Sequence, residues 1–187
     1  MRKKLPKFYY FIDKLDIEEV KNLNKKIAII YRNYQKEPQM KEIVEFKRFC
    51  KKNKRIFIIS NFFKIALKYN LDGIYIPSFN NKILLNKYSN IKNFIVVGSA
   101  HNFKEIRVKE RQGVQQIFLS PIFPIIKNKN YLGINKFNLL SKFTKKEVVA
   151  LGGINKNNIK KLNMTNVCGF ASINYIKNKN PISNLIL

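Results

Sequence analysis

The sequence is poor in the residues that build covalent or metal-bound frameworks. It has two cysteines, Cys50 and Cys168, one histidine and no tryptophan. Two isolated cysteines in apolar stretches exclude a disulfide scaffold and a cysteine-ligated metal site, and we expect both to be buried thiols in a reducing cytosol. No apolar run approaches the roughly 18 residues of a membrane helix, and the run over residues 8–12 is too short for the core of a signal peptide. We therefore expect a cytoplasmic protein without a membrane partner.

Acidic residues are scarce. Asp and Glu number 11 against 37 Lys and Arg, which gives a formal net charge of +26. Such an excess attracts anions, and one interpretation is binding to nucleic acid or an anionic membrane. However, the lysines are spread along the chain, and Lys, Asn, Ile, Phe and Tyr are abundant together while Ala and Gly are scarce. These residues have A- and T-rich codons, so we attribute the charge mainly to base composition and expect phosphorylated small molecules, not nucleic acid, as partners.

Short apolar runs recur along the chain and alternate with amphipathic stretches. The runs are apolar on both faces, which is typical of parallel strands covered by helices. The expected strands are residues 8–12, 27–31, 56–60, 73–76, 94–98, 116–120, 148–151 and 168–171. The expected helices are residues 40–51, 62–69, 103–111 and 155–162, of which the third has a solvated face of Lys and Arg.

Eight strands that alternate with helices, without repeats or linkers, predict a single-domain (β/α)₈ TIM barrel over residues 1–187. The chain is short for this fold, which typically needs about 250 residues, so its loops must be minimal. The tail from Asn174 offers only a reduced C-terminal helix. A doubly wound open sheet is the alternative, because the first and eighth helices are weak. The short ends also suggest a homo-oligomer in which a second subunit covers the reduced helix.

Polar and glycine residues gather at the C-terminal ends of these strands, where a TIM barrel has its active face. Arg32 follows the second strand, Ser99 and His101 follow the fifth, and Gly152-Gly153 follows the seventh. A guanidinium can hold an anion through two hydrogen bonds, and a histidine can move a proton near neutral pH. Glycines ahead of a helix allow the backbone to approach a phosphate.

Each of these residues also has a plain structural interpretation. Arg32 can be one more surface arginine among many basic residues. His101 can merely precede a helix-capping box over residues 102–105. The glycine pair can be an ordinary tight turn.

Three motifs, in this order, resemble the thiamine-phosphate synthase/TenI family. They are Gly98-Ser99-Ala100-His101, Ser120-Pro121-Ile122-Phe123-Pro124 and Ala150-Leu151-Gly152-Gly153-Ile154. With weaker matches, the resemblance covers nearly the whole chain. It implies the same barrel and a thiazole phosphate as ligand.

The resemblance also implies roles for particular residues. The phosphate would be held by Gly152 and Gly153, and by Ser172 and Asn174 after the eighth strand. Ser99 would contact a phosphate or a pyrimidine through its hydroxyl. These expectations place one phosphate site on the active face of the barrel.

The family contains two activities, and this sequence departs from one of them. The synthase joins a pyrimidine pyrophosphate to thiazole phosphate with Mg²⁺, whereas the TenI-type tautomerase shifts a double bond in a thiazole carboxylate phosphate and needs no metal. The metal-binding aspartates of the synthase follow the third and fourth strands, where this sequence has Ser60, Asn61 and Asn80. Neutral amides alone seldom hold Mg²⁺. For Asn61, the alternative to a ligand-binding role is a helix cap.

The groups that grip pyrophosphate in the synthase are also replaced. Ile30 and Tyr34 flank Arg32, where the family has a glutamine and a lysine. The loop after the sixth strand lacks the threonines of the synthase, and Lys127 or Lys129 would have to substitute for its lysine. Both departures weaken the expectation of pyrophosphate binding.

We therefore expect an atypical member of the family with TenI-like thiazole chemistry. His101 would shuttle the proton and Arg32 would hold an anionic group. No cofactor is expected, except Mg²⁺ if synthase activity is retained. The alternatives are an active synthase, a barrel that binds a phosphate ligand without catalysis, and an RNA-binding protein driven by charge, which lacks any recognisable nucleic-acid motif.

Overall fold

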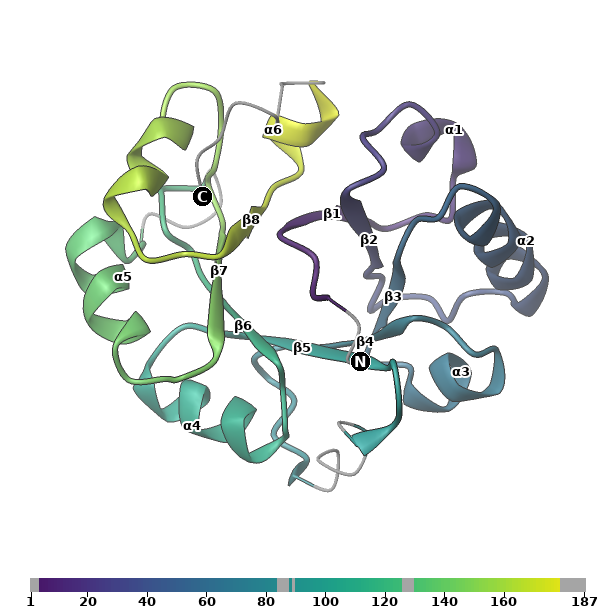
Figure 1. The fold of residues 1–187 in the computed structure, drawn as a ribbon, viewed down its shortest axis with the longest axis horizontal. Coiled ribbons are helices and arrows are strands. Elements are labelled where there is room, and N and C mark those ends of the chain that lie inside the picture. Colours follow the sequence, from purple (N-terminus) through teal and green to yellow (C-terminus); the bar gives the residue numbers. More distant parts are fainter. Residues whose placement is uncertain (1–3, 84–87, 89, 126–129, 179–187) are drawn as a thin grey trace.

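The strands of the computed structural model, which describes residues 4–83, 88, 90–125 and 130–178, close into a barrel (Figure 1). The strands are β1 (Phe8–Ile12), β2 (Ile27–Tyr31), β3 (Phe57–Ser60), β4 (Gly73–Ile76), β5 (Ile95–Ala100), β6 (Gln116–Leu119), β7 (Glu147–Leu151) and β8 (Gly169–Ala171). They pair in parallel and in chain order, and β1 pairs with both β2 and β8. The predicted TIM barrel is confirmed. The doubly wound alternative is wrong, because the pairing of β1 with β8 leaves this sheet without an open edge.

The helices lie outside the ring of strands in Figure 1. They are α1 (Ile17–Val20), α2 (Met40–Lys52), α3 (Phe63–Lys68), α4 (Phe103–Arg111), α5 (Gly133–Ser141), the 3₁₀ helix η2 (Ile159–Met164) and α6 (Asn174–Lys177). The reduced C-terminal helix is confirmed, since α6 has four residues. Among the described residues, no helix combines the length and apolar character needed to cross a bilayer.

The helix predicted over residues 155–162 is wrong in its start and its type. The segment forms η2 only from Ile159 onward. The side chain of Asn158 accepts from the backbone N–H of Asn155 at 2.9 Å and donates to the carbonyl of Gly153 at 2.8 Å. The carbonyl of Asn155 accepts from the backbone N–H of Ile159 at 3.0 Å, so residues 155–158 form a turn, and the side-chain bonds of Asn158 compete with a regular α-helix there.

The side chains of each strand alternate between two buried layers. Tyr9 and Phe11 point to one layer and Tyr10 and Ile12 to the other, as the period of two in a strand requires. The first layer fills the barrel, because it draws on all eight strands and no helix. Aromatic rings fill much of it: Phe118 lies 4.8 Å from Tyr9 and 5.6 Å from Tyr75 between ring centroids.

A polar cluster closes the N-terminal end of the barrel. The buried amide of Gln116 accepts a hydrogen bond from the Tyr9 hydroxyl and donates to the carbonyl of Pro6 at 3.0 Å and to the carboxylate of Glu147 at 2.7 Å. The half-buried Cys168 lies beside it, with its sulfur 3.6 Å from Gln116 Nε2. The expectation of a buried thiol therefore holds for Cys50, which is 1% exposed, but only in part for Cys168.

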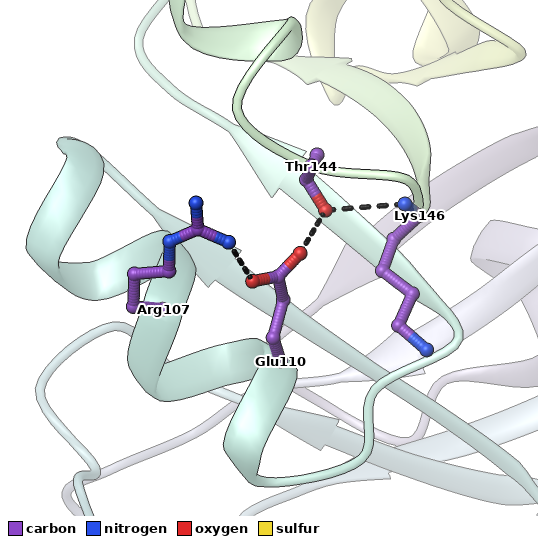
Figure 2. A network of polar contacts seen from close by, with 4 residues as sticks. All are labelled: Arg107, Glu110, Thr144 and Lys146. Carbon is purple, nitrogen blue, oxygen red and sulfur yellow. Dashed lines mark hydrogen bonds and ion pairs between the residues drawn. The ribbon is translucent and has the colours of Figure 1, made fainter.

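Helix α4 is tied to the loop before β7 by a second polar network (Figure 2). The carboxylate of Glu110 accepts from Arg107 Nη1 and from the Thr144 hydroxyl, each at 2.7 Å. The Thr144 hydroxyl in turn accepts from the backbone N–H of Lys146 at 3.1 Å. These contacts fix α4 against the loop before β7.

Candidate active site

The closed barrel brings the predicted site residues to one end of the molecule. Parallel strands in a barrel have their C-terminal ends at the same face, which we call the mouth. The predicted residues that end or directly follow a strand there are Arg32 (β2), Asn61 (β3), Ser99 and His101 (β5), Gly152 and Gly153 (β7) and Ser172 and Asn174 (β8). Lys127, also predicted to bind phosphate, lies outside the described residues.

The imidazole of His101 is held at both nitrogens. Its Nδ1 lies 2.7 Å from the carbonyl oxygen of Ser120, and its Nε2 lies 3.0 Å from the hydroxyl oxygen of Ser78. A carbonyl oxygen can only accept, so Nδ1 carries the proton of the neutral ring. Nε2 is then unprotonated and accepts from the Ser78 hydroxyl. Nε2 of His101 therefore lies at the mouth as a nitrogen that can accept a proton, on an exposed side chain.

The capping arrangement predicted after His101 is present as well. The side chain of Asn102 accepts from the backbone N–H of Glu105 at 3.0 Å and so caps α4. The Glu105 carboxylate accepts from the backbone N–H of His101 at 2.8 Å. The predicted cap is thus formed by Asn102 and Glu105, the neighbours of His101. The His101 ring takes no part in it and contacts Ser120 and Ser78 instead.

Arg32 lies over the aromatic filling of the barrel. Its guanidinium carbon is 4.4 Å from the ring centroid of Phe11, a cation–π contact, and the residue is half-buried. Burial raises the pKa of Tyr75 to about 12, and the neighbouring side chains of Ser99 and Arg32 oppose this rise. Arg32, Ser99 and Tyr75 therefore lie near one another at the mouth.

The two asparagines after β3 and β4 are paired with each other. Asn80 Nδ2 donates to Asn61 Oδ1 at 2.6 Å. The helix-cap alternative for Asn61 is wrong, because α3 has Phe62 at its N-cap position and no side-chain cap, while Asn61 Oδ1 accepts from Asn80. Nearby, the hydroxyl of Ser60 lies 3.4 Å from that of Tyr34. Among the described residues, no three His, Cys, Asp or Glu side chains gather as a metal site would need.

The glycine pair after β7 lets that strand end pass close to the loop after β6. Gly152 has a φ of +92° and Gly153 a φ of +71°. A Cβ on Gly153 would lie 2.4 Å from the carbonyl oxygen of Phe123, and one on Gly152 would lie 2.6 Å from Pro121 Cβ. The expectation that the pair opens a helix is wrong, since η2 begins six residues later. Any phosphate contact would therefore come from turn N–H groups, without a helix behind them.

Ser172 links the ends of β7 and β8. It is buried, and its hydroxyl donates to the carbonyl of Ile154 at 2.9 Å and accepts from the backbone N–H of Tyr175 at 3.1 Å. Asn174 is exposed at the start of α6. Ser172 thus fixes the backbone around the glycine turn, and Asn174 is the more accessible of the two predicted phosphate ligands.

The solvated Lys and Arg face expected for the helix over residues 103–111 does not include every basic residue of that helix. Lys109 of α4 is fully buried. Its Nζ donates to the carbonyls of Pro77 and Asn80, both at 2.8 Å, and to Gln112 Oε1 at 2.9 Å. Its spacing of three residues from the buried Ile106 was the available signal, because residues three apart share a helix face.

The burial of Lys109 makes the stability of the protein depend on pH. Burial lowers the pKa of Lys109 to about 8 from the ordinary 10.5. Between these values the unfolded chain binds more protons than the folded one, so the free energy of unfolding should rise with pH across this window. From the pKa difference we expect a contribution of up to about 3 kcal/mol.

Urea denaturation on both sides of the window checks this expectation. The rise in the free energy of unfolding should be smaller in Lys109→Met than in the wild type, because the contribution of Lys109 is gone. Some pH dependence should remain, because the other titrating groups are present in both proteins. Lys104→Met, which changes an exposed lysine of the same helix, should behave as the wild type. An equal pH dependence in wild type and Lys109→Met would contradict the prediction.

Comparison with known proteins gives consistent matches. The family model described as thiamine monophosphate synthase matches residues 16–176. The chain is 31% identical over 141 residues to a thiamine-phosphate synthase of Prochlorococcus marinus subsp. pastoris, covering 74% of this chain and 40% of that protein. It is 27% identical over 186 residues to a thiamine-phosphate synthase of Methanococcus vannielii, covering 94% of this chain and 89% of that one.

Solved structures agree on the fold. The chain is similar to a thiamine phosphate pyrophosphorylase from Pyrococcus furiosus, with a TM-score of 0.71 and 23% identity, over 90% of this chain and 85% of the other. A structure described as native KDPGal has a TM-score of 0.67 at 13% identity. At these identities the likeness shows the barrel alone, and the chemistry has to be argued from the residues at the mouth.

Proposed function

Because the chain belongs to the thiamine monophosphate synthase family, we propose that it acts on a thiazole phosphate in thiamine biosynthesis by TenI-type proton transfer. The reaction would shift a double bond within a thiazole carboxylate phosphate. It requires a base that removes a proton from carbon and an acid that returns it elsewhere in the same conjugated system. The observation that carries the proposal is the position of the His101 ring: Nδ1 lies 2.7 Å from the Ser120 carbonyl oxygen, which can only accept, and this leaves Nε2, beside the Ser78 hydroxyl, as the nitrogen that can take a proton.

A single base is sufficient for this isomerisation. A substrate C–H proton moves to Nε2 of His101 and leaves its electron pair in the conjugated substrate. The resulting imidazolium is stabilised by the Ser120 carbonyl, which accepts from Nδ1–H at 2.7 Å. Nε2 then returns a proton to a second atom of the substrate, which completes the isomerisation without loss or gain of atoms. Ser78 donates to Nε2 at 3.0 Å before the substrate binds.

The other residues at the mouth would hold the substrate. Arg32, kept in place over Phe11, can bind a carboxylate through two parallel hydrogen bonds. The turn at Gly152 and Gly153 can bring backbone N–H groups against a phosphate. Asn174, exposed at the adjacent end of β8, can add a side-chain hydrogen bond. Ser99, near the end of β5, can add a hydroxyl group on the same face.

The Mg²⁺ that the synthase reaction uses does not fit the residues after β3 and β4. Mg²⁺ prefers charged oxygen ligands in octahedral geometry. Ser60 and the amide pair of Asn61 and Asn80 carry no charge, and Asn61 Oδ1 already accepts a hydrogen bond at 2.6 Å. These residues therefore do not fit the metal, and this mismatch favours the isomerisation over the coupling reaction.

The synthase reaction is the second candidate. The relatives' names favour it, and Arg32, Ser99 and His101, which the synthase resemblance implies, are retained. Two assays on purified protein separate the candidates: isomerisation of the thiazole carboxylate phosphate in the presence of a chelator, and formation of thiamine phosphate from pyrimidine pyrophosphate, thiazole phosphate and Mg²⁺.

We expect isomerisation in the chelator and no thiamine phosphate. Arg32→Ala should remove the isomerisation, and Arg111→Ala, at an exposed arginine that ends α4, should not. Thiamine phosphate formed by the wild type and lost in Arg32→Ala would establish the synthase instead. Binding of thiazole phosphate without turnover in either assay would show a non-catalytic barrel and overturn the proposal.

A further inference from the structure

The inner side of α4 holds the segment that follows β4 through its backbone carbonyls. Lys109 Nζ donates to the carbonyls of Pro77 and Asn80, and Gln112 Nε2 donates to those of Asn80 at 2.8 Å and Lys82 at 3.2 Å. Lys109 and Gln112 are themselves joined at 2.9 Å. All three protons of the ammonium are thus used, and α4 contacts the segment at three separate residues.

This segment carries the hydroxyl that faces His101. Ser78 lies between the two residues whose carbonyls Lys109 binds, and its oxygen is 3.0 Å from His101 Nε2. His101 is fixed from the same helix, because Glu105 accepts from its backbone N–H. One helix therefore sets both partners of the pair, His101 at its first turn and Ser78 through Lys109 near its last.

A charged side chain is rarely found fully buried, as Lys109 is here. A buried ammonium loses its hydration, and the acceptors of Lys109 within the described part of the chain are two carbonyl oxygens and one amide oxygen, all uncharged. Glu105, on the same helix, is the charged group whose field favours the protonated form. The side chain packs against β5, where a Cβ on Gly98 would lie 3.0 Å from Lys109 Cδ. Residues that go against burial preferences in this way tend to serve a site.

We propose that Lys109 is a positioning residue that sets the Ser78 hydroxyl against His101 Nε2 by binding the carbonyls of Pro77 and Asn80. Lys109 would place the Ser78 hydroxyl in this way whichever reaction the protein catalyses.

The single histidine makes a direct test possible, because the protein has one set of imidazole signals. Nitrogen NMR of the ring near neutral pH, with Lys109 protonated, reports the hydrogen bond at each nitrogen separately. Ser78→Ala supplies the reference for a ring without the Ser78 bond. In Lys109→Met we expect the Nε2 signal to move toward that reference, while Nδ1, bound to Ser120, stays near its wild-type value. Lys104→Met, on the exposed face of α4, should leave both signals unchanged.

Two results would overturn the inference. One is a folded Lys109→Met protein, by circular dichroism, with a wild-type Nε2 signal. The other is Ser78→Ala with an unmoved Nε2 signal, which would mean that the pair does not form in solution. If Lys109→Met does not fold, Gln112→Ala takes its place, because it removes two donors to the same segment and one acceptor of Lys109. We expect it to move Nε2 in the same direction, and an unmoved signal there also overturns the inference.

Discussion

Replacement of His101 by alanine should lower the turnover of the thiazole carboxylate phosphate by about 100- to 10,000-fold, the usual range for loss of a general base. Binding should change little, because the proposed ligands of the carboxylate and phosphate, Arg32 and the turn at Gly152-Gly153, belong to other strands. Steady-state kinetics and calorimetric titration with the substrate measure the two effects separately. The expected pattern is a fall in kcat with a nearly unchanged dissociation constant.

Asn102→Ala is the matched control for this variant. Asn102 caps α4, because its Oδ1 accepts from the Glu105 backbone N–H at 3.0 Å. The substitution removes this cap but leaves the imidazole of His101 in place. It should cost about 1 kcal/mol of stability and keep most of the turnover. If His101→Ala kept its turnover, or if Asn102→Ala lost as much, then His101 would be acting as part of the cap and not as the base.

Gly153→Ala should cost about 3 kcal/mol of stability and abolish binding of thiazole phosphate. Its Cβ would lie 2.4 Å from the carbonyl oxygen of Phe123 and 2.5 Å from that of Pro124. Both obstacles are backbone atoms, so the strand end and the neighbouring loop must separate, and strain of this kind belongs to the largest class of single-substitution effects. Urea denaturation and calorimetric titration with thiazole phosphate measure the two losses.

Gly133→Ala separates the clash from the backbone conformation. Gly133 has a φ of +67°, close to the +71° of Gly153, but the nearest atom to its Cβ would be Tyr131 Cε2 at 3.8 Å. This control should cost only about 1 kcal/mol, the penalty for a side chain at positive φ, and should leave binding intact. Equal stability and equal binding in the two variants would show that the close approach at Gly153 serves neither the fold nor the phosphate.

The strands were predictable because their apolar runs are continuous. Three expected strands, 8–12, 27–31 and 73–76, match the structure at both ends, and the others differ by one or two residues. A strand that is buried on both faces is apolar at every position, so its first and last residues can be recognised in the sequence. In contrast, α5 was not predicted, since only Phe137 and Leu140 of its nine residues are buried.

The details of the site depend on contacts between distant segments, which periodicity does not reveal. Asn61 was open to interpretation as a helix cap because its partner, Asn80, lies 19 residues along the chain. The burial of Lys109 was not predicted, because the carbonyl of Pro77 that it binds lies 32 residues earlier. The positions of the strand ends predict which residues lie at the same face of the barrel. They do not predict which side chains contact each other, because those contacts depend on the tertiary structure.

The polar and aromatic filling of the barrel also determines how molecules reach the mouth. The described side chains occupy the interior from Gln116 at one end, through Phe118, to Tyr75 under the mouth. Within the described part of the chain, this packed interior leaves no path for a substrate, so a ligand would enter and leave through the mouth. In the proposed reaction the product would occupy the same face as the substrate, and we therefore expect it to inhibit competitively.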